Sequence, residues 1–366
     1  MKGFAKPNYF ICVLISTVLV SCSGVSTKQE KVHRMACEAG IPLIQVAYAE
    51  GDSCTVFEAS AFQETPARMD AGTVFQAASL SKPVFASIVL QMAHEELIHL
   101  DTPLVHYTDI ERFEDKELAC TLTARTVLSH VTGLPNWSTG PGSEEWPTAP
   151  ISFKFTPDSA FSYSGEGYAF LQRAVEAVCG AGLEDIARSR IFEPLGMDRT
   201  SYVWIPAYDS LATDGFNREG ESGGKGNFPR ANAAYTLRTT AADYMKFLRY
   251  ISRENLPERE WLSGMYLPVV QAVRYHDRPR ECDSTIFWGL GMGMEKHPEL
   301  GEVSFHWGDN GNFKALFLMV PESKVHKERI LVYFTNSRAG HDIIGSMSSL
   351  FLGNKKPLAI ENWVLD

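Results

Sequence analysis

The apolar positions of this 366-residue chain predict β-strands near both of its ends. Ile41 to Tyr48 and Cys54 to Ala61 are strand-like runs on either side of Glu50-Gly51-Asp52, which indicates a β-hairpin. In the last third of the chain the spacing of apolar residues is again that of β-strands, and it predicts three of them: Val303 to His306, Ala315 to Val320 and Ile330 to Thr335. Sheet-forming segments therefore lie at both ends of the chain.

Helical spacing dominates the middle of the chain. After Ser79, apolar residues recur near helical spacing, and Gly167 to Val178 forms an amphipathic pattern that Gly180 ends. Ala241 to Ile251 is a further helical segment. Strands at both ends with helices between them predict an α+β fold, in which an antiparallel sheet is flanked by helices and carries a largely helical insertion at about 101–235.

The first residues have the pattern of an export signal. Two lysines precede an apolar run from Tyr9 to Val20, which is too short and wrongly flanked for an ordinary membrane-spanning helix. The run ends in Leu19-Val20-Ser21-Cys22, which resembles a bacterial lipobox with Cys22 as the lipidated residue; a plain secretory signal is the alternative. We expect a lipoprotein signal over 1–22, a polar tether over 23–36, one domain over 37–352 and a tail over 353–366. The exported protein would associate with the periplasmic side of a membrane, the outer membrane or the cell surface.

Composition narrows the classes of function. Hydrophobic residues make up 45% and charged residues 21% of the chain, which is ordinary for a globular protein. The net charge of −10, with no run of basic residues, argues against a nucleic-acid partner. The cysteines beyond the signal are odd in number and widely spaced, which argues against a disulfide framework or a zinc site; they are Cys37, Cys54, Cys120, Cys179 and Cys282. No metal or other cofactor is expected.

The strongest chemical signal is Ser79-Leu80-Ser81-Lys82 at the start of a helical pattern. On a helix, residues i and i+3 share a face, so the amine of Lys82 can reach the hydroxyl of Ser79. Burial lowers the pKa of a lysine, and a neutral amine can accept the proton of a serine that attacks a carbonyl carbon. The alternative is that Ser79 only caps the helix, which serine favours.

Other motifs along the chain are weaker. Ser222 and Lys225 repeat the same spacing, but in a glycine-rich segment that nothing holds in one geometry. His94 and His99 are five residues apart, so on a helix they diverge instead of forming a zinc-protease pair. His130 is interpreted as a turn residue and not as a catalytic base.

Three further segments accompany the serine–lysine motif. Phe161-Ser162-Tyr163-Ser164-Gly165 precedes a helix, Ser129-His130-Val131-Thr132-Gly133-Leu134-Pro135 is typical of a turn, and Phe305-His306-Trp307-Gly308-Asp309-Asn310-Gly311 ends a strand. Together they resemble the serine hydrolase family of class C β-lactamases and related penicillin-binding proteins, esterases and D-aminopeptidases. The resemblance covers about Gly40 to Asn336 and implies the β-lactamase/transpeptidase-like fold.

The resemblance implies a role for each matching residue. Ser79 would be the acylated nucleophile and Lys82 its base, or the group that lowers the pKa of the base. Tyr163 would carry the proton toward the leaving group, and His306 would stand in the third motif. The backbone N–H groups of Ser79 and Asp309 would form the oxyanion hole.

Two departures from the family pattern concern the substrate cleft, which Gly165, Trp307 and Gly308 would line. The tyrosine motif of the family usually ends in asparagine, which contacts the substrate amide, but this chain has Gly165. His306 replaces the lysine of many members, and histidine is mostly uncharged near neutral pH. Both changes point away from penicillin and toward an ester or an unusual amide.

The sequence therefore predicts a membrane-anchored serine hydrolase that acts on a small ester or peptide-like amide and needs no obligate protein partner. Esterase or D-aminopeptidase-like activity is favoured over D,D-carboxypeptidase and β-lactamase activity. The alternative from another class is a catalytically weak protein that keeps the fold and binds or senses cell-wall fragments.

Overall fold

The computed structural model describes residues 22–61, 70–274 and 279–364. Of the predicted signal over 1–22, residues 1–21 lie outside these ranges, and so does the side chain of Cys22. No helix in the described ranges has both the length and the apolar character that crossing a membrane requires.

Within the described residues, eight strands form one antiparallel sheet in the order β2-β1-β10-β9-β8-β7-β6-β5. The strands from the two ends of the chain lie side by side near the β2 edge of the sheet, where Ile44 of β1 pairs with Thr335 of β10. Their bounds are β1 (Ile44–Glu50), β2 (Ser53–Ala59), β5 (Val270–Gln271), β6 (Ile286–Trp288), β7 (Gly293–His297), β8 (Gly301–Asp309), β9 (Lys314–Val320) and β10 (Arg329–Thr335). A second, two-stranded sheet joins β3 (Phe75–Gln76) to β4 (Arg238–Thr239).

The central strands are buried on both faces, which is why they read as continuous apolar runs. Successive side chains of a strand point to opposite faces. On β10, Val332 and Phe334 join the core beside α2 (Ser81–His94) and α9 (Ala241–Ile251), whereas Leu331 and Tyr333 join the opposite core.

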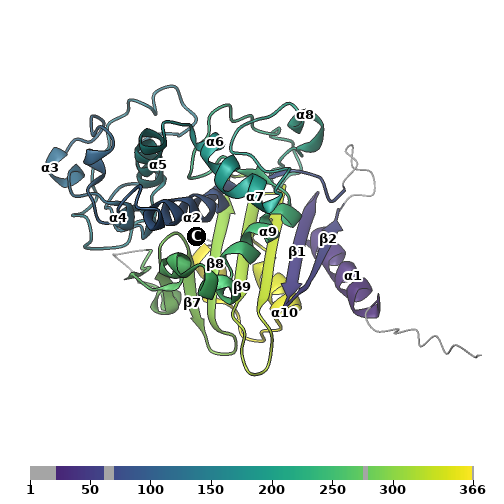
Figure 1. Cartoon of the computed structure of the whole chain (residues 1–366). Helices are drawn as coiled ribbons and strands as arrows, with labels where there is room; N and C mark the ends of the chain where they lie inside the picture. Colours follow the sequence, from purple (N-terminus) through teal and green to yellow (C-terminus); the bar gives the residue numbers. More distant parts are fainter. Residues whose placement is uncertain (1–21, 62–69, 275–278, 365–366) are drawn as a thin grey trace, which may run out of the picture.

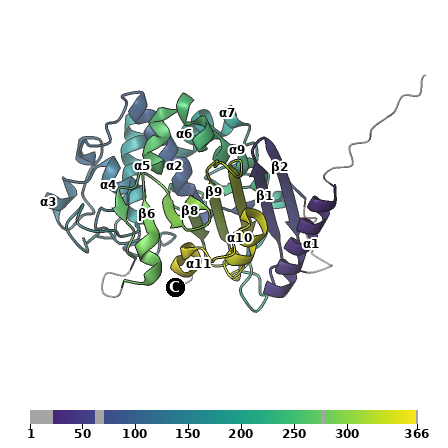
Figure 2. The ribbon, with the colours of Figure 1, turned by 90° about the horizontal axis from the view of Figure 1, so that it is seen from below.

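Helices from both ends of the chain cover that opposite face (Figure 2): α1 (Cys22–Ala39), α10 (Ile344–Leu352) and α11 (Ala359–Val364). The expected polar tether over 23–36 is instead most of α1, whose Val32 and Ala36 are fully buried. The expected tail over 353–366 instead contains α11, with Trp363 fully buried in the same core. In both segments a few apolar residues at helical spacing outweigh the polar majority, because burying them removes apolar surface from water.

The residues between β3 and β4 hold α2 and the helical region beyond one end of the sheet (Figure 1). This region corresponds to the predicted insertion, but loops and turns make up more of it than helices do. Its helices are α3 (Lys116–Ala119), α4 (Ala124–Leu128), α5 (Gly165–Cys179), α6 (Leu183–Ala187), α7 (Glu193–Leu195) and α8 (Tyr208–Leu211), with a π-helical turn at Arg188–Phe192. Short 3₁₀ turns complete the chain at Ala78–Leu80 (η1), Leu104–His106, Arg253–Glu258, Glu260–Tyr266 and Glu281–Thr285.

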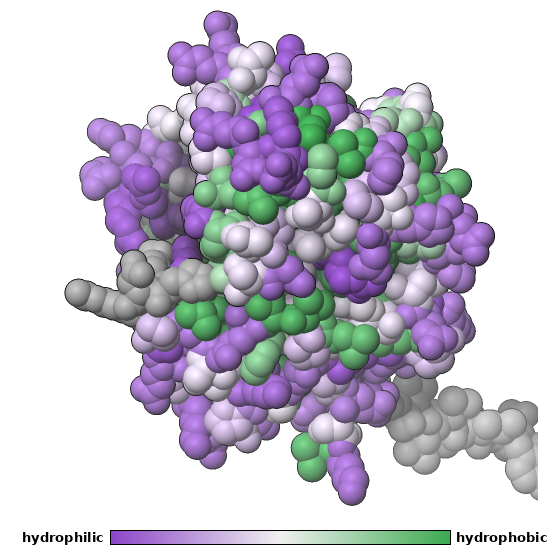
Figure 3. Space-filling view, turned by 90° about the vertical axis from the view of Figure 1, so that its left-hand side faces the viewer, coloured by the Kyte–Doolittle hydropathy of each residue, from purple (hydrophilic) through white to green (hydrophobic). Residues whose placement is uncertain are grey.

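The surface is mixed in character. On the face shown in Figure 3, apolar residues lie in small groups among hydrophilic ones. Among the described residues, the large apolar side chains that stay exposed are Leu97, Leu267, Val269 and Val325.

Candidate active site

Ser79 lies in the short turn η1 that leads into α2. The residue before it, Ala78, has a φ of 49°, a left-handed conformation that is costly for a residue with a side chain. The cap position of α2 is Leu80, and no side chain caps the helix. Ser79 is therefore not the helix cap, and its hydroxyl faces a cavity instead.

Lys82 is the nearest base to that hydroxyl. Its Nζ lies 3.2 Å from Ser79 Oγ and donates to the carbonyl oxygen of Ala234 at 2.9 Å. The side chain is 1% exposed, and burial lowers the pKa of Lys82 well below its usual value. A neutral amine that gives one N–H to Ala234 keeps its lone pair for the proton of Ser79.

Tyr163 lies beside both Ser79 and Lys82. The Nζ of Lys82 is 4.6 Å from the centroid of its ring. Burial raises the pKa of Tyr163, and the neighbouring Ser79 side chain lowers it by less. The buried hydroxyl makes no well-formed hydrogen bond to another group in the described part of the chain, so its proton is available to a bound molecule.

His130, which the sequence indicated only as a turn residue, is part of this cluster. It does sit in a turn, with a φ of 58°, but its side chain is fully buried. Its ring packs 4.3 Å from that of Tyr163, centroid to centroid, and its Nδ1 accepts from the backbone N–H of Ser164 at 3.1 Å. Burial, with Lys82 and His306 nearby, lowers the pKa of His130 well below its usual value.

His306 stands on β8 and is also fully buried and neutral. Burial lowers its pKa to about 3, and the nearby Lys82 adds to this effect. Its Nδ1 lies 2.7 Å from the carbonyl oxygen of Trp307, so Nδ1 carries the proton and Nε2 is left as an acceptor. That Nε2 has no partner within the described ranges.

The buried indole of Trp288 packs against these three rings. The centroid of Trp288 lies 5.3 Å from His130, 5.4 Å from His306 and 6.0 Å from Tyr163. Because dense apolar packing surrounds the three polar groups, their charged forms are disfavoured and their orientations are held.

Gly308 allows β8 to pack closely against η1, the turn that contains Ser79. A side chain at this position would begin 2.4 Å from the carbonyl oxygen of Ala77, a backbone atom. Only glycine permits this approach. It brings the next residue, Asp309, to the cavity that Ser79 lines.

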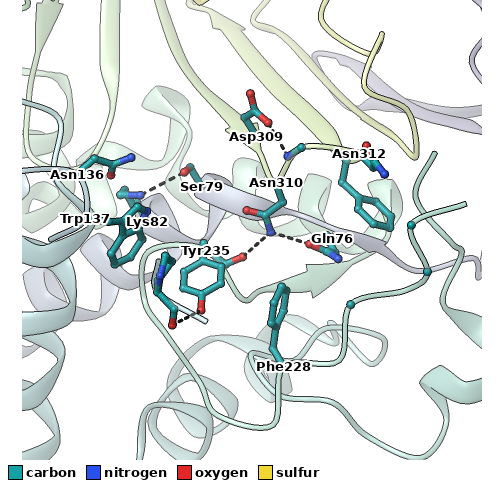
Figure 4. Close-up of a pocket in the computed structure, with 16 residues that line it drawn as sticks. Gln76, Ser79, Lys82, Asn136, Trp137, Phe228, Tyr235, Asp309, Asn310 and Asn312 are labelled. Carbon is teal, nitrogen blue, oxygen red and sulfur yellow. Dashed lines mark hydrogen bonds between the residues drawn. The ribbon is translucent and has the colours of Figure 1, made fainter. Parts of the chain in front are cut away.

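An aromatic cavity of about 510 Å³ opens on one side of Ser79 (Figure 4). Among the described residues, its charged lining residues are Lys82 and Asp309. The rest of the lining is aromatic, amide-bearing or small: Gln76, Asn136, Trp137, Pro141, Gly223, Gly224, Gly226, Phe228, Tyr235, Asn310, Gly311, Asn312 and Phe313.

A second, cationic cavity of about 430 Å³ is also lined by Ser79. Its described lining residues include four cationic side chains, namely Arg218, Arg274, Lys314 and Arg338. Asp309 and Asp342 also line it, and they pair with Lys314 and Arg218. His341 completes this wall, and burial lowers its pKa to about 4.

The structure thus brings together Ser79, Lys82, Tyr163, His306 and Asp309. Trp307, predicted for the cleft, lines the cationic cavity. Gly165 and Gly308 were also predicted to line the cleft, but neither is among the residues that line the two cavities: Gly308 packs on Ala77, and Gly165 packs on Trp137. At both positions the lack of a side chain is what permits this close packing.

The residues of the weaker motifs do not form sites in the structure. Lys225 donates to the carbonyl oxygen of Asp209 at 2.7 Å and Ser222 to the carboxylate of Asp214 at 2.9 Å, so they do not form a pair. His94 and His99 are exposed, and no group of residues suited to a metal ion occurs in the described ranges.

Sequence reasoning missed Asn136, Trp137 and the cationic side chains of the second cavity. Asn136 and Trp137 directly follow the turn motif Gly133-Leu134-Pro135, which was the only signal that could have drawn attention to them. The cationic residues come from segments far apart in the chain, so no local pattern marks them.

Comparison with known proteins identifies relatives of the chain. The family model described as beta-lactamase matches residues 29–344. Penicillin-binding protein 4 of Amycolatopsis lactamdurans is 27% identical over 238 residues, which is 60% of this chain and 62% of that protein. The chain spans about three fifths of the length of the curated relatives it matches, 62% and 61%.

Solved structures share the fold. A D-stereospecific amidohydrolase from a Streptomyces species superposes with a TM-score of 0.69 at 18% identity, covering 90% of this chain and 99% of that one. A class C beta-lactamase variant gives a TM-score of 0.72 at 16% identity, covering 90% and 97%. At these identities the likeness concerns the fold alone, which is the predicted β-lactamase/transpeptidase-like fold.

Proposed function

The chain belongs to the beta-lactamase family, and on that premise we propose that it is a serine hydrolase that forms an acyl-enzyme on Ser79. One observation carries the proposal: a buried Lys82 of lowered pKa lies 3.2 Å from the hydroxyl of Ser79, at the junction of two cavities. A neutral lysine next to an accessible serine is an activated nucleophile.

In the proposed cycle, Ser79 Oγ attacks the carbonyl carbon of an ester or amide while its proton passes to Lys82. The hydroxyl of Tyr163 gives its proton to the leaving group and regains one from Lys82. The backbone N–H groups of Ser79 and Asp309 stabilise the oxyanion, an interaction worth about 2.7–4 kcal/mol per donor. Water then cleaves the acyl-enzyme and restores Ser79.

The two cavities suggest which end of the substrate lies where. The aromatic cavity suits an acyl group with apolar and amide parts. The cationic cavity suits a leaving group with a carboxylate, because four cationic side chains there face two carboxylates. The permanent cation that His306 cannot supply, with its pKa of about 3, is available from these residues.

Because peptide-like amides often carry a carboxylate on the leaving group, this charge distribution is compatible with amide substrates as well as esters. The amidohydrolase and penicillin-binding relatives support the same reading. We therefore propose an ester or peptide-like amide with an anionic leaving group; D,D-carboxypeptidase and β-lactamase activity are the further candidates.

The second candidate is a catalytically weak protein that binds or senses cell-wall fragments. Gly165 favours it, because this position offers no side chain to a substrate. Such a protein would form an acyl-enzyme with a penicillin but hydrolyse that acyl-enzyme very slowly.

The test is intact-mass spectrometry after exposure to a fluorophosphonate, a fluorescent penicillin and p-nitrophenyl acetate. We expect wild type and Ser222→Ala to gain one adduct with the fluorophosphonate and to turn over the ester, and Ser79→Ala to do neither. Labelling of Ser79→Ala would refute the proposed nucleophile. A stable penicillin adduct without ester turnover would favour the binding protein.

We also propose that the protein is exported and anchored through a lipid on Cys22. The lipobox-like Leu19-Val20-Ser21-Cys22 supports this proposal. The anchor would leave the hydrolase domain in an oxidising compartment outside the cytoplasm.

A further inference from the structure

The position of the missing asparagine is not an empty space. A side chain at Gly165 would begin 2.4 Å from the indole ring of Trp137. An asparagine there would have to displace the tryptophan that walls the aromatic cavity. The amide contact associated with this position cannot come from residue 165 in the observed arrangement.

Another amide lies beside Gly165. The Oδ1 of Asn136 accepts from the backbone N–H of Gly165 at 3.0 Å. This bond determines the orientation of the amide, because oxygen and not nitrogen must face the N–H. The Nδ2 group, with two hydrogens to donate, turns the other way and has no partner in the described part of the chain. In Figure 4 this amide lies on the same side of the cavity as Ser79 and Lys82.

Asn136 stands at the junction of the two cavities. Of the described residues, three line both of them, namely Ser79, Asn136 and Asp309. Other amides of the aromatic cavity are engaged: Asn310 Nδ2 donates to Gln76 Oε1 at 2.7 Å, and Gln76 Nε2 donates to the carbonyl oxygen of Lys225 at 2.9 Å. Asn136 is therefore the amide of this cavity that also borders the cationic cavity and keeps an Nδ2 donor unengaged among the described residues.

The segment that carries Asn136 is held from several sides. The backbone oxygen of Asn136 accepts from the N–H groups of Gly165 and Glu166, both at 3.0 Å. Ser164 Oγ donates to the carbonyl oxygen of Pro135 at 2.7 Å, and the buried carboxylate of Glu166 accepts from the N–H of Ser138 at 3.0 Å. A donor held in place before binding loses little conformational freedom when a ligand arrives.

We propose that Asn136 is the specificity-determining residue that recognises an amide carbonyl in the acyl part of the substrate. Its Nδ2 donates to the carbonyl oxygen of an N-acylamino-acyl group, whose apolar end extends between Trp137 and Phe228. In this chain Asn136, from a neighbouring loop, would make the contact with the substrate amide that the last residue of the tyrosine motif usually makes. This inference rests on the proposed acyl-enzyme function of Ser79.

The experiment compares two p-nitrophenyl esters with the same leaving group and scissile bond. One carries an N-acetylglycyl group, and the other carries an alkyl acyl group of equal length without the amide. We expect wild type to prefer the N-acetylglycyl ester. Asn136→Leu should lower kcat/KM about three- to tenfold for that ester alone, the effect of losing one neutral hydrogen bond.

Two further variants sharpen the comparison. Asn136→Asp keeps an acceptor for the N–H of Gly165 but has no Nδ2 donor, so it should fold like wild type and still lose the preference. Asn312→Leu, at the opposite end of the same cavity in Figure 4, should change kcat/KM for both esters by the same factor. A thermal melt of each variant separates a folding defect from a loss of recognition.

The outcomes distinguish this inference from the proposed function. Equal losses for both esters in Asn136→Leu, or no preference in wild type, would overturn the role of Asn136 and leave the acyl-enzyme intact. If wild type hydrolyses neither ester and Ser79 gains no adduct, the proposed function fails and this inference fails with it.

Discussion

At the scale of single residues, burial sets the charge of each group around Ser79. It lowers the pKa values of Lys82, His130 and His306, and it raises that of Tyr163. In each case desolvation disfavours the charged form. Burial therefore favours the neutral forms of a lysine amine, a phenol and two imidazoles in this cluster, and the amine of Lys82 is the base in contact with the nucleophile.

This arrangement predicts the pH dependence of catalysis. As pH rises, kcat/KM for an activated ester should increase along a single limb as Lys82 loses its proton in the free enzyme. His306 should add no limb near the usual histidine value of about 6.5, because its pKa is about 3 and it is already neutral there. His306→Asn should leave the midpoint of this pH profile unchanged; an inflection that disappears in this variant would contradict the prediction.

His130 should act as a positioning residue for Tyr163. His130→Phe keeps an aromatic ring beside Tyr163 but leaves the N–H of Ser164 without its acceptor, at a cost of about 1–3 kcal/mol in the free energy of unfolding. We expect kcat to fall more than KM changes, because the hydroxyl of Tyr163 loses its orientation. The measurements are denaturant unfolding and steady-state kinetics.

The matched variant for His130 is His130→Asn. Asparagine offers an oxygen acceptor and tolerates the left-handed backbone at this position, where φ is 58°. It should recover much of the stability that His130→Phe loses. Equal stability of the two variants would show that the bond to Ser164 contributes nothing.

At the scale of elements, the site depends on one strand passing close to one turn. On β8, Phe305 and Trp307 face the core beneath α10 and α11, so His306 and Gly308 face the nucleophile turn. The contact between β8 and η1 exists only because residue 308 lacks a side chain, and it brings Asp309 to the cavities that Ser79 lines.

Gly308→Ala should therefore impair catalysis more than folding. Its new methyl group would lie 2.4 Å from the carbonyl oxygen of Ala77, so β8 and η1 must separate. Displacing one oxyanion donor costs about 10²–10³-fold in kcat. The control is Gly142→Ala, since a side chain at Gly142 meets no atom within 4 Å and should leave kcat unchanged. Wild-type kcat in Gly308→Ala would argue against Asp309 as an oxyanion donor.

At the scale of the whole molecule, charge is distributed unevenly. The chain carries a net charge of −10, yet the cationic cavity beside Ser79 is lined by three arginines and a lysine. The overall negative charge disfavours polyanionic partners such as nucleic acids, while the local cations attract a small anionic group into the site.

The proposed anchor belongs to this scale as well. Wild-type protein expressed in a bacterial host should carry a lipid on Cys22 and sediment with membranes, whereas Cys22→Ala should not be lipidated. Purified Cys22→Ala should retain ester hydrolysis, since the site lies in the sheet and insertion. The measurements are membrane fractionation and intact mass; an unlipidated wild-type protein cleaved at another residue would refute the anchor.

The local sequence was sufficient to predict the main helices and strands and to identify the motif residues. The helix Ala241–Ile251 and the strands around Ala315 to Val320 were predicted almost to the residue, because their apolar spacing reflects the faces they bury. The i, i+3 spacing of Ser79 and Lys82 likewise encodes their contact within one turn of chain. The order of the motifs was enough to indicate the family.

Only the tertiary structure decided which residues surround that motif. Asn136 reaches Gly165, His130 reaches Tyr163 and Arg338 reaches the wall of the cationic cavity across long stretches of sequence. No local period records such contacts, because they depend on how the insertion packs against the sheet. Burial is likewise a property of the packed chain, so the lowered pKa values of Lys82 and His306 appear only once the fold has removed them from water.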